Sequence, residues 1–292
     1  MKITKTLILI LITLTLASLA CGITLTMPDD AIEIGELRTE EIFVSAPAAG
    51  NTASVMLEFG AGKLSLQPGA AEGLIVGTAS YNVDGLEPVV AAGGGDVSIK
   101  QEPYEFKLGG LPNVNEVENT WELYFSDHPV ELEVRAGAYS GDFELGGMAI
   151  QELKITSGAA RTNLSFTTPN LTNMGQFHFR TGASTAHLNQ LSNANFSLMK
   201  FEGGAGSYTL DFSGTLTRDA TVEIDAALSS VKLIVPENIP TTLHIESSLT
   251  NVNAHGYWYG GGDTYTLSGY NGPTLTFVIK LGAGNLDLST LP

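Results

Sequence analysis

The sequence contains one cysteine, few basic residues and no long apolar run beyond its first 20 positions. Its 292 residues include Cys21 alone, so no disulfide forms within the chain and a packed core must stabilise the fold. Lys and Arg number 14 against 31 Asp and Glu, which gives a net charge of −17. Such a surface repels phosphate backbones and anionic head groups, so the composition disfavours a nucleic-acid partner.

Residues of the kinds that carry catalysis or bind metals are scattered. The five histidines show no His-x-x-x-His spacing. Cys21 is the only cysteine, so no cysteine is available in the rest of the chain as a metal ligand. Glu133 is followed one repeat later by Lys154, so the spacing predicts no column of carboxylates for glycoside hydrolysis. Nucleophile elbows and phosphate-binding loops are absent from the sequence. We therefore expect no enzyme activity, no catalytic residues, no metal and no cofactor.

The first 20 residues have the pattern of an export signal. Two lysines precede a short apolar run and then small residues, and the run is too short to span a membrane. Residues 16–22 resemble the bacterial lipoprotein box, although Ser18 stands where leucine is more common. This resemblance predicts a lipid on Cys21 that anchors the chain to a membrane. The alternative is cleavage by a general signal peptidase after Ala20, which would cut the same bond.

The most regular feature is a short phrase written six times between Leu132 and Ala254, at intervals of 21 to 24 residues. With Gly137 as the reference position, the equivalent residues are Gly158, Gly182, Gly204, Ala227 and Ser248, with outlying copies at Gly60 and Gly282. Large apolar residues occupy the positions five and three before the reference and six after it in every copy, except at Ala254. The intervening position is mostly polar, which is the period-two alternation of a β-strand.

A period near 22 residues without amphipathic helices is typical of stacked coils. We therefore predict an all-β fold, a parallel β-solenoid-like stack of about 22-residue repeats with a smaller N-terminal β domain. We expect this stack of coils to end at Leu288. The alternative is an antiparallel β-sandwich built of hairpins, in which each Gly-Ala pair is a turn, although the links between phrases are more regular than sandwich loops.

Four stretches carry a resemblance to a known family: 59–64 (FGAGKL), 77–88 with its Tyr81–Asn82 pair, 135–142 (RAGAYSGD) and 281–286 (LGAGNL). They are similar to the toast-rack family of bacterial envelope proteins of unknown function, which is related to proteins proposed to be adhesin heads. The resemblance implies an N-terminal toast-rack domain followed by a repetitive β domain. The expected organisation is a signal peptide at 1–20, an acidic tether at 21–36, the toast-rack β domain at 37–112 and the repetitive β-solenoid domain at 119–292.

An insertion at 255–272 lengthens the last interval to 34 residues. Its aromatic residues, set among glycines, are Tyr257, Trp258, Tyr259, Tyr265 and Tyr270. The rings at 257, 258, 259 and 265 are candidates for contacts with a sugar or a peptide. The alternative is a hairpin that covers the last coil, which repeat proteins need at their ends.

Taken together, the patterns predict an exported, membrane-anchored lipoprotein of the bacterial cell envelope. The expected role is a non-catalytic surface binding or adhesion module whose partners are the membrane, through the lipid on Cys21, and a cell-surface glycan or protein. One alternative is a structural or envelope-stress-linked scaffold, and a second is a polysaccharide-acting enzyme.

Overall fold

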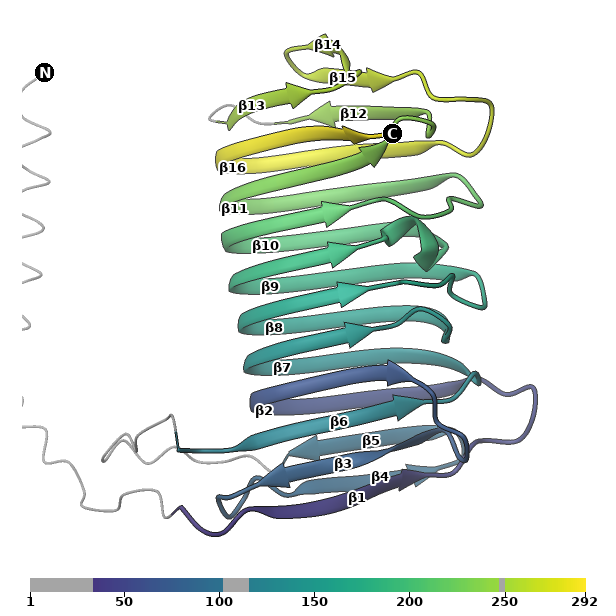
Figure 1. Cartoon of the computed structure of the whole chain (residues 1–292), viewed down its shortest axis with the longest axis vertical. Coiled ribbons are helices and arrows are strands. Elements are labelled where there is room, and N and C mark those ends of the chain that lie inside the picture. The colour runs from purple at the N-terminus through teal and green to yellow at the C-terminus, as the bar shows by residue number, and fades with distance from the viewer. Residues whose placement is uncertain (1–33, 102–115, 247–249) are drawn as a thin grey trace, which may run out of the picture. The chain divides into compact units, whose positions relative to one another are not determined.

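The computed structural model describes residues 34–101, 116–246 and 250–292, and these residues are folded almost entirely as β-strands (Figure 1). The strands are β1 Arg38–Val44, β2 Ala53–Pro68, β3 Ile75–Tyr81, β4 Pro88–Gly93, β5 Asp96–Gln101, β6 Asn119–Phe125, β7 Pro129–Glu144, β8 Ala149–Ser165, β9 Met174–Asn189, β10 Phe196–Asp211, β11 Ala220–Pro236, β12 Thr241–Ile245, β13 Thr250–His255, β14 Tyr259–Gly261, β15 Thr264–Leu267 and β16 Leu275–Leu291. A single 3₁₀ turn, Leu191–Ala194, interrupts them in the described residues.

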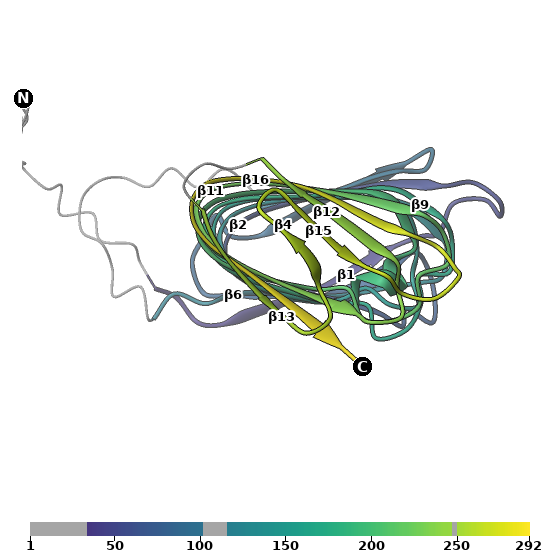
Figure 2. The same ribbon diagram turned by 90° about the horizontal axis from the view of Figure 1, so that it is seen from above.

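Seven long strands form the body of the stack: β2, β7, β8, β9, β10, β11 and β16 (Figure 1). Seen from above, their coils lie over one another (Figure 2). Each has 16 or 17 residues, contains one copy of the phrase and pairs in parallel with its neighbours. The register aligns equivalent positions, so that Leu132 lies opposite Leu153 and Phe143 opposite Leu164. The predicted parallel solenoid is confirmed. The hairpin alternative is wrong, because each Gly-Ala pair bends one continuous strand instead of joining two antiparallel ones.

The three apolar positions of each copy face the interior of the coils. Their rows across the long strands are buried: Val55, Leu132, Leu153, Phe177, Met199, Val222 and Phe277; Leu57, Val134, Ile155, Phe179, Phe201, Ile224 and Ile279; Leu66, Phe143, Leu164, Leu188, Leu210, Leu233 and Leu288. Burying each such side chain contributes about 1.5 to 3 kcal/mol. The core therefore runs continuously through the stack, and each coil depends on the next for its burial.

At the reference position the chain turns a corner, and the backbones of adjacent coils come close together. A Cβ placed on Gly182 would lie 2.5 Å from the carbonyl oxygen of Gly158, and one on Gly204 would lie 2.4 Å from that of Gly182. Gly137 shows the same contact with Gly60, at 2.4 Å. Glycine is favoured at these corners because a side chain would collide with the backbone of the coil before it.

The last two copies of the phrase exchange places in the stack. The sheet order is β11, β16 and then β12, so the C-terminal strand lies between two strands that precede it in the chain. Phe277 accordingly lies opposite Val222 on one side and opposite Leu243 on the other. The expectation that the stack ends at Leu288 is therefore wrong, because the insertion at 255–272 carries the chain around the end coil before β16 returns.

Both ends of the stack carry a coil split into two short strands. β5 and β6 pair with the first and second halves of β2, and β12 and β13 pair in the same way with β16. Antiparallel strands then follow: β4 on β5, β3 and β1 beyond β6, and β15 and β14 beyond β12. The division into domains at 37–112 and 119–292 stays a prediction, and strands from both of these ranges belong to the same sheet.

Candidate binding surfaces

The outward side chains of each coil form two surfaces, one on either side of the glycine corner. We call the surface before the corner the charged face; it comprises Glu58, Glu131, Glu133, Arg135, Glu152, Lys154, His178, Arg180, Lys200, Glu202, Glu223, Asp225 and Lys280. We call the surface after the corner the hydroxyl face; it comprises Lys63, Ser65, Ser140, Asp142, Arg161, Asn163, Thr185, His187, Ser207, Thr209, Ser230, Lys232, Asn285 and Asp287. Both arise from the same strands and the same alternation.

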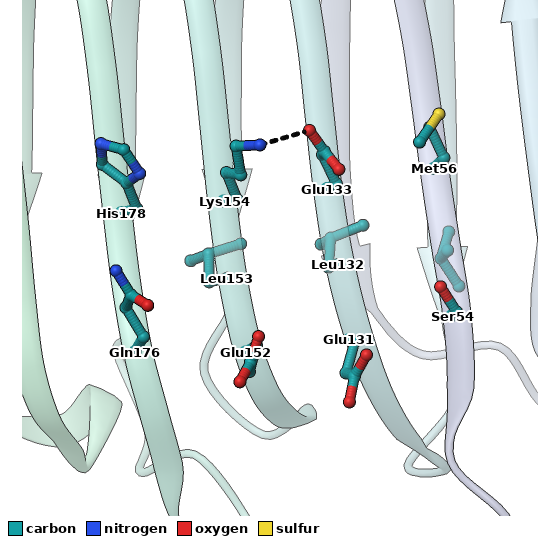
Figure 3. A pocket seen from close by; sticks show the side chains of 11 residues that line it. Ser54, Met56, Glu131, Leu132, Glu133, Glu152, Leu153, Lys154, Gln176 and His178 are labelled. Atoms are coloured by element: carbon teal, nitrogen blue, oxygen red, sulfur yellow. Dashed lines mark ion pairs between the residues drawn. The ribbon is translucent and has the colours of Figure 1, made fainter.

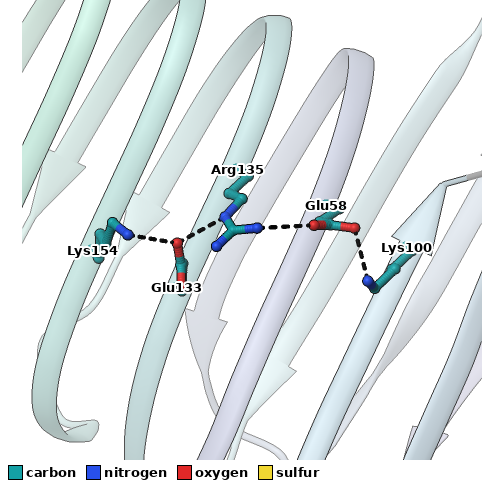
Figure 4. A network of polar contacts seen from close by, with 5 residues as sticks. All are labelled: Glu58, Lys100, Glu133, Arg135 and Lys154. Atoms are coloured by element: carbon teal, nitrogen blue, oxygen red, sulfur yellow. Dashed lines mark hydrogen bonds and ion pairs between the residues drawn. The ribbon is translucent and has the colours of Figure 1, made fainter. Parts of the chain in front are cut away.

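Ion pairs connect neighbouring strands on the charged face (Figure 4). Glu58 pairs with Lys100 at 3.0 Å and with Arg135 at 3.3 Å. Glu133 pairs with Arg135 at 2.8 Å and with Lys154 at 2.9 Å. Burial alone would raise the pKa of Glu133, but the hydrogen bonds from Lys154 and Arg135 outweigh it and the pKa is lowered. One network thus joins β5, β2, β7 and β8.

A small depression crosses the charged face over β2, β7, β8 and β9 (Figure 3). It has a volume of about 180 Å³, and its upper row holds Glu133, Lys154 and His178. In its lower row Glu131 and Glu152 lie opposite each other on adjacent strands, because they continue the register that pairs Leu132 with Leu153. The sequence analysis missed this acidic pair, although both residues stand six positions before their reference glycines.

The acidic pair does not have the surroundings of a catalytic site. Glu131 and Glu152 are both exposed on an open sheet surface, whereas glycoside hydrolysis needs one carboxyl group that burial keeps protonated. Among the residues that the structure describes, no group of three or more His, Cys, Asp or Glu is placed to hold a metal ion. His178, on β9 in the upper row, lies 3.0 Å from Glu202 on the next strand.

The hydroxyl face has a different character. Within the described ranges, no ion pair joins two of its side chains. Next to the corner, a shallow open groove has a floor of alanines that includes Ala159 and Ala183, and Ser140, Arg161 and Thr185 line it. None of these last three side chains has a protein hydrogen-bond partner in the described part of the chain. Their donors and acceptors are therefore available to solvent or to a ligand.

The aromatic insertion lies at the end of the stack, where β15 pairs with β12 and β14 pairs with β15. Trp258 and Tyr265 are partly buried and pack against the core. Tyr257 and Tyr259 point into solvent, with 63% and 61% of their surfaces exposed, and Tyr270 is 76% exposed. The insertion thus holds rings of both kinds, and ligand binding by residues 257, 258, 259 and 265 stays a prediction.

The predicted anchor, Cys21, and the signal at 1–20 lie outside the described residues. Within the described ranges, no helix is long and apolar enough to cross a bilayer.

The geometry defines a β-solenoid-like protein in which a stack of parallel coils presents two polar faces and an aromatic hairpin. Residues 33–174 match the family described as the N-terminal domain of toast_rack, DUF2154. This match confirms the toast-rack resemblance recognised in the sequence.

Solved structures align with most of this chain. A "putative cell adhesion protein" from Clostridium sporogenes aligns over 88% of this chain and 100% of its own, with 18% identity and a TM-score of 0.50. A "putative adhesin" from Parabacteroides distasonis aligns over 87% and 97%, with 9% identity and a TM-score of 0.39. The first likeness supports the fold alone. A search of curated proteins gave no match.

Proposed function

We propose that the chain is a lipid-anchored cell-envelope protein that acts as a non-catalytic surface binding or adhesion module. The observation that carries the proposal is the position of the aromatic hairpin in the sheet. β1, the first strand of the body, lies at one end of the sheet order, and β14 lies at the other. An anchor at Cys21 would therefore hold the β1 end near the membrane and present the hairpin at the far end.

The distance involved is large for a chain of this size. The sheet order from β1 to β14 contains twelve strand-to-strand steps, and at about 4.8 Å per step they span roughly 58 Å. Tyr257 and Tyr259 at that end are exposed, and such rings are suited to stacking on sugars or packing against a protein. The toast-rack match over residues 33–174 is consistent with the same role and does not suggest an enzyme.

The test compares the mature chain with the double variant Tyr257→Ser/Tyr259→Ser. Both chains are immobilised and exposed to a glycan array and to cell-envelope extract. Because the two rings are exposed, the variant should keep the melting temperature of the wild type while it loses at least about tenfold in affinity for any retained ligand. A scaffold would retain no defined ligand, and a ligand held equally by both chains would show that the hairpin is not the binding site.

Trp258→Ala is the matched control for the structural part of the hairpin. Because Trp258 packs against the core, its removal should lower the free energy of unfolding by about 2 kcal/mol, less than a fully buried tryptophan costs. Urea denaturation measures this loss. A variant with unchanged stability and lost ligand binding would show that Trp258 itself is the contact residue.

The anchor needs a separate experiment, because it is independent of the hairpin. Cys21→Ser should move the exported chain from the membrane fraction to the fluid outside the cell or in the periplasm, as judged by fractionation and immunoblotting. Membrane association that persists in this variant would place the anchor elsewhere in the chain.

A further inference from the structure

The two split coils at the ends of the stack contain four short strands, and three of them are covered. β5 is covered by β4, β6 by β3, and β12 by β15, each in antiparallel pairing. β13 pairs with β16 along one edge, and no described strand pairs with its other edge. Among the described residues its outer backbone N–H and C=O groups have no partner, so they can bind a further strand.

The outermost strands elsewhere carry features that discourage such pairing. β1 presents Arg38, Glu40 and Glu41, β4 begins with Pro88, and β14 has three residues of which two are glycine. Charges, proline and shortness are the usual means by which sheet edges avoid adding strands. β13 has the sequence TNVNAH, with no proline, no glycine, no lysine and no acidic residue.

The apolar core is also incomplete beside β13. The position six residues after the corner holds a large buried side chain in every long strand, such as Leu288, the register partner of Ala254. Ala254 is small and exposed, and Val252 is only partly buried although its partner Leu286 is fully buried. A strand added next to β13 would place alternate side chains over these two residues and extend the core by one half-coil.

We propose that the free edge of β13 binds an extended segment of another protein by β-strand addition. The segment would be neutral or basic, with large apolar residues at alternate positions that cover Val252 and Ala254. The net charge of −17 disfavours both an acidic segment and a second copy of this chain, which would bring the same charge. This inference goes beyond the proposed function, because it concerns the side of the end coil that the aromatic hairpin does not pair with.

A synthetic peptide with the sequence of residues 229–235, SSVKLIV, serves as the probe. It has large apolar residues at alternate positions, Val231, Leu233 and Val235, carries one lysine and forms the equivalent half-coil in β11. The capped, fluorescently labelled peptide is titrated with the mature chain, and its anisotropy is followed. The alternating peptide should bind, whereas a peptide of the same composition with the alternation destroyed should bind at least about tenfold more weakly.

Ala254→Asp and Asn251→Asp form a matched pair of variants with the same added charge on the same strand. Ala254→Asp places a carboxylate where the added strand would bury it, so affinity should fall by about tenfold or more. Asn251→Asp changes an outward position, and its affinity should stay within about threefold of the wild type. Thermal melts check that both variants remain folded, as expected for exposed sites.

Equal binding by the two variants, or equal binding of the two peptides, would overturn the proposal. Analytical sedimentation of the chain alone tests whether a second copy of the chain occupies the edge of β13. A concentration-dependent dimer that Ala254→Asp abolishes would show that a second copy covers the edge, which would overturn the assignment to a different protein. Failure of the peptide to bind would also count against the proposal, but it leaves the test of Tyr257 and Tyr259 unaffected, so the two proposals can fail separately.

Discussion

The charged face and the hydroxyl face come from the two halves of the same strands, yet their polar groups are used in opposite ways. Before the corner, long side chains reach across strands and neutralise one another, as Glu133 does with Arg135 and Lys154. After the corner, the side chains of Ser140 and Thr185 have no protein hydrogen-bond partner among the described residues. The inward residues are apolar in both halves of each strand, and their packing determines the path of the coil. The outward residues do not determine that path, so the two surfaces can differ in their polar groups.

The largest expected effect is the loss of the core that both faces share. Ile155→Asp would bury an unpaired carboxylate between the two sides of a coil and should lower the free energy of unfolding by about 3 to 5 kcal/mol. Chemical denaturation measures the loss. The control is Lys154→Asp on the adjacent outward position, which should cost about 1 kcal/mol or less. Retained stability in Ile155→Asp together with unfolding of Lys154→Asp would reverse the assignment of inside and outside.

A second change acts at the corner that separates the two faces. Gly182→Ala would place a methyl group 2.5 Å from the carbonyl oxygen of Gly158, and the resulting shift should cost about 2 kcal/mol. Ala227 occupies the same position in β11, so Ala227→Gly is the matched control and should change stability by less than about 1 kcal/mol. Thermal unfolding compares the two. If Gly182→Ala is neutral, the corner backbones are farther apart than described.

A smaller effect is expected from the ion pairs of the charged face. Glu133→Gln removes the group shared by Arg135 and Lys154, and it should destabilise the fold by about 0.5 to 1 kcal/mol at low salt and less at high salt. The pKa of Glu133 is lowered from 4.5, so its contribution is present above the pKa of the unfolded chain and disappears as pH falls through the lower, folded-state value.

Unfolding curves of Glu133→Gln and the wild type, recorded at neutral pH and at acidic pH, check this sign. The two should converge as the pH falls, and a gap that widens in acid would contradict the lowered pKa.

The smallest effect is expected on the hydroxyl face. Thr185→Ala removes an outward hydroxyl with no protein partner among the described residues, so stability should change by less than about 0.5 kcal/mol. Differential scanning calorimetry would detect a larger loss. Such a loss would mean that Thr185 makes a stabilising contact within the folded chain. The polar groups of the hydroxyl face would then contribute to stability, as those of the charged face do.

Most of the fold could be predicted from the sequence repeats, because the inward apolar positions recur with one period and the copies align in register. The coil formed by β5 and β6 was missed, since residues 102–118 separate Ile99 from Leu123 and break that period. The place of β16 was also missed, because spacing along the chain does not state which copies are neighbours in space. Of the candidate site, the sequence identified the aromatic insertion but not which rings turn inward. That outcome depends on packing against the end coil.

The position of β16 also bears on the order in which the chain can assemble. From β7 to β11, neighbours in space are neighbours in sequence, so these coils can form one after another as the chain emerges, with short loops to close. β12 cannot dock on the growing stack in the same way, because its parallel partner, β16, is made after it. Residues 241–267 can therefore join the stack only after β16 has been made, and the edge of β11 stays unpaired until β16 pairs with it.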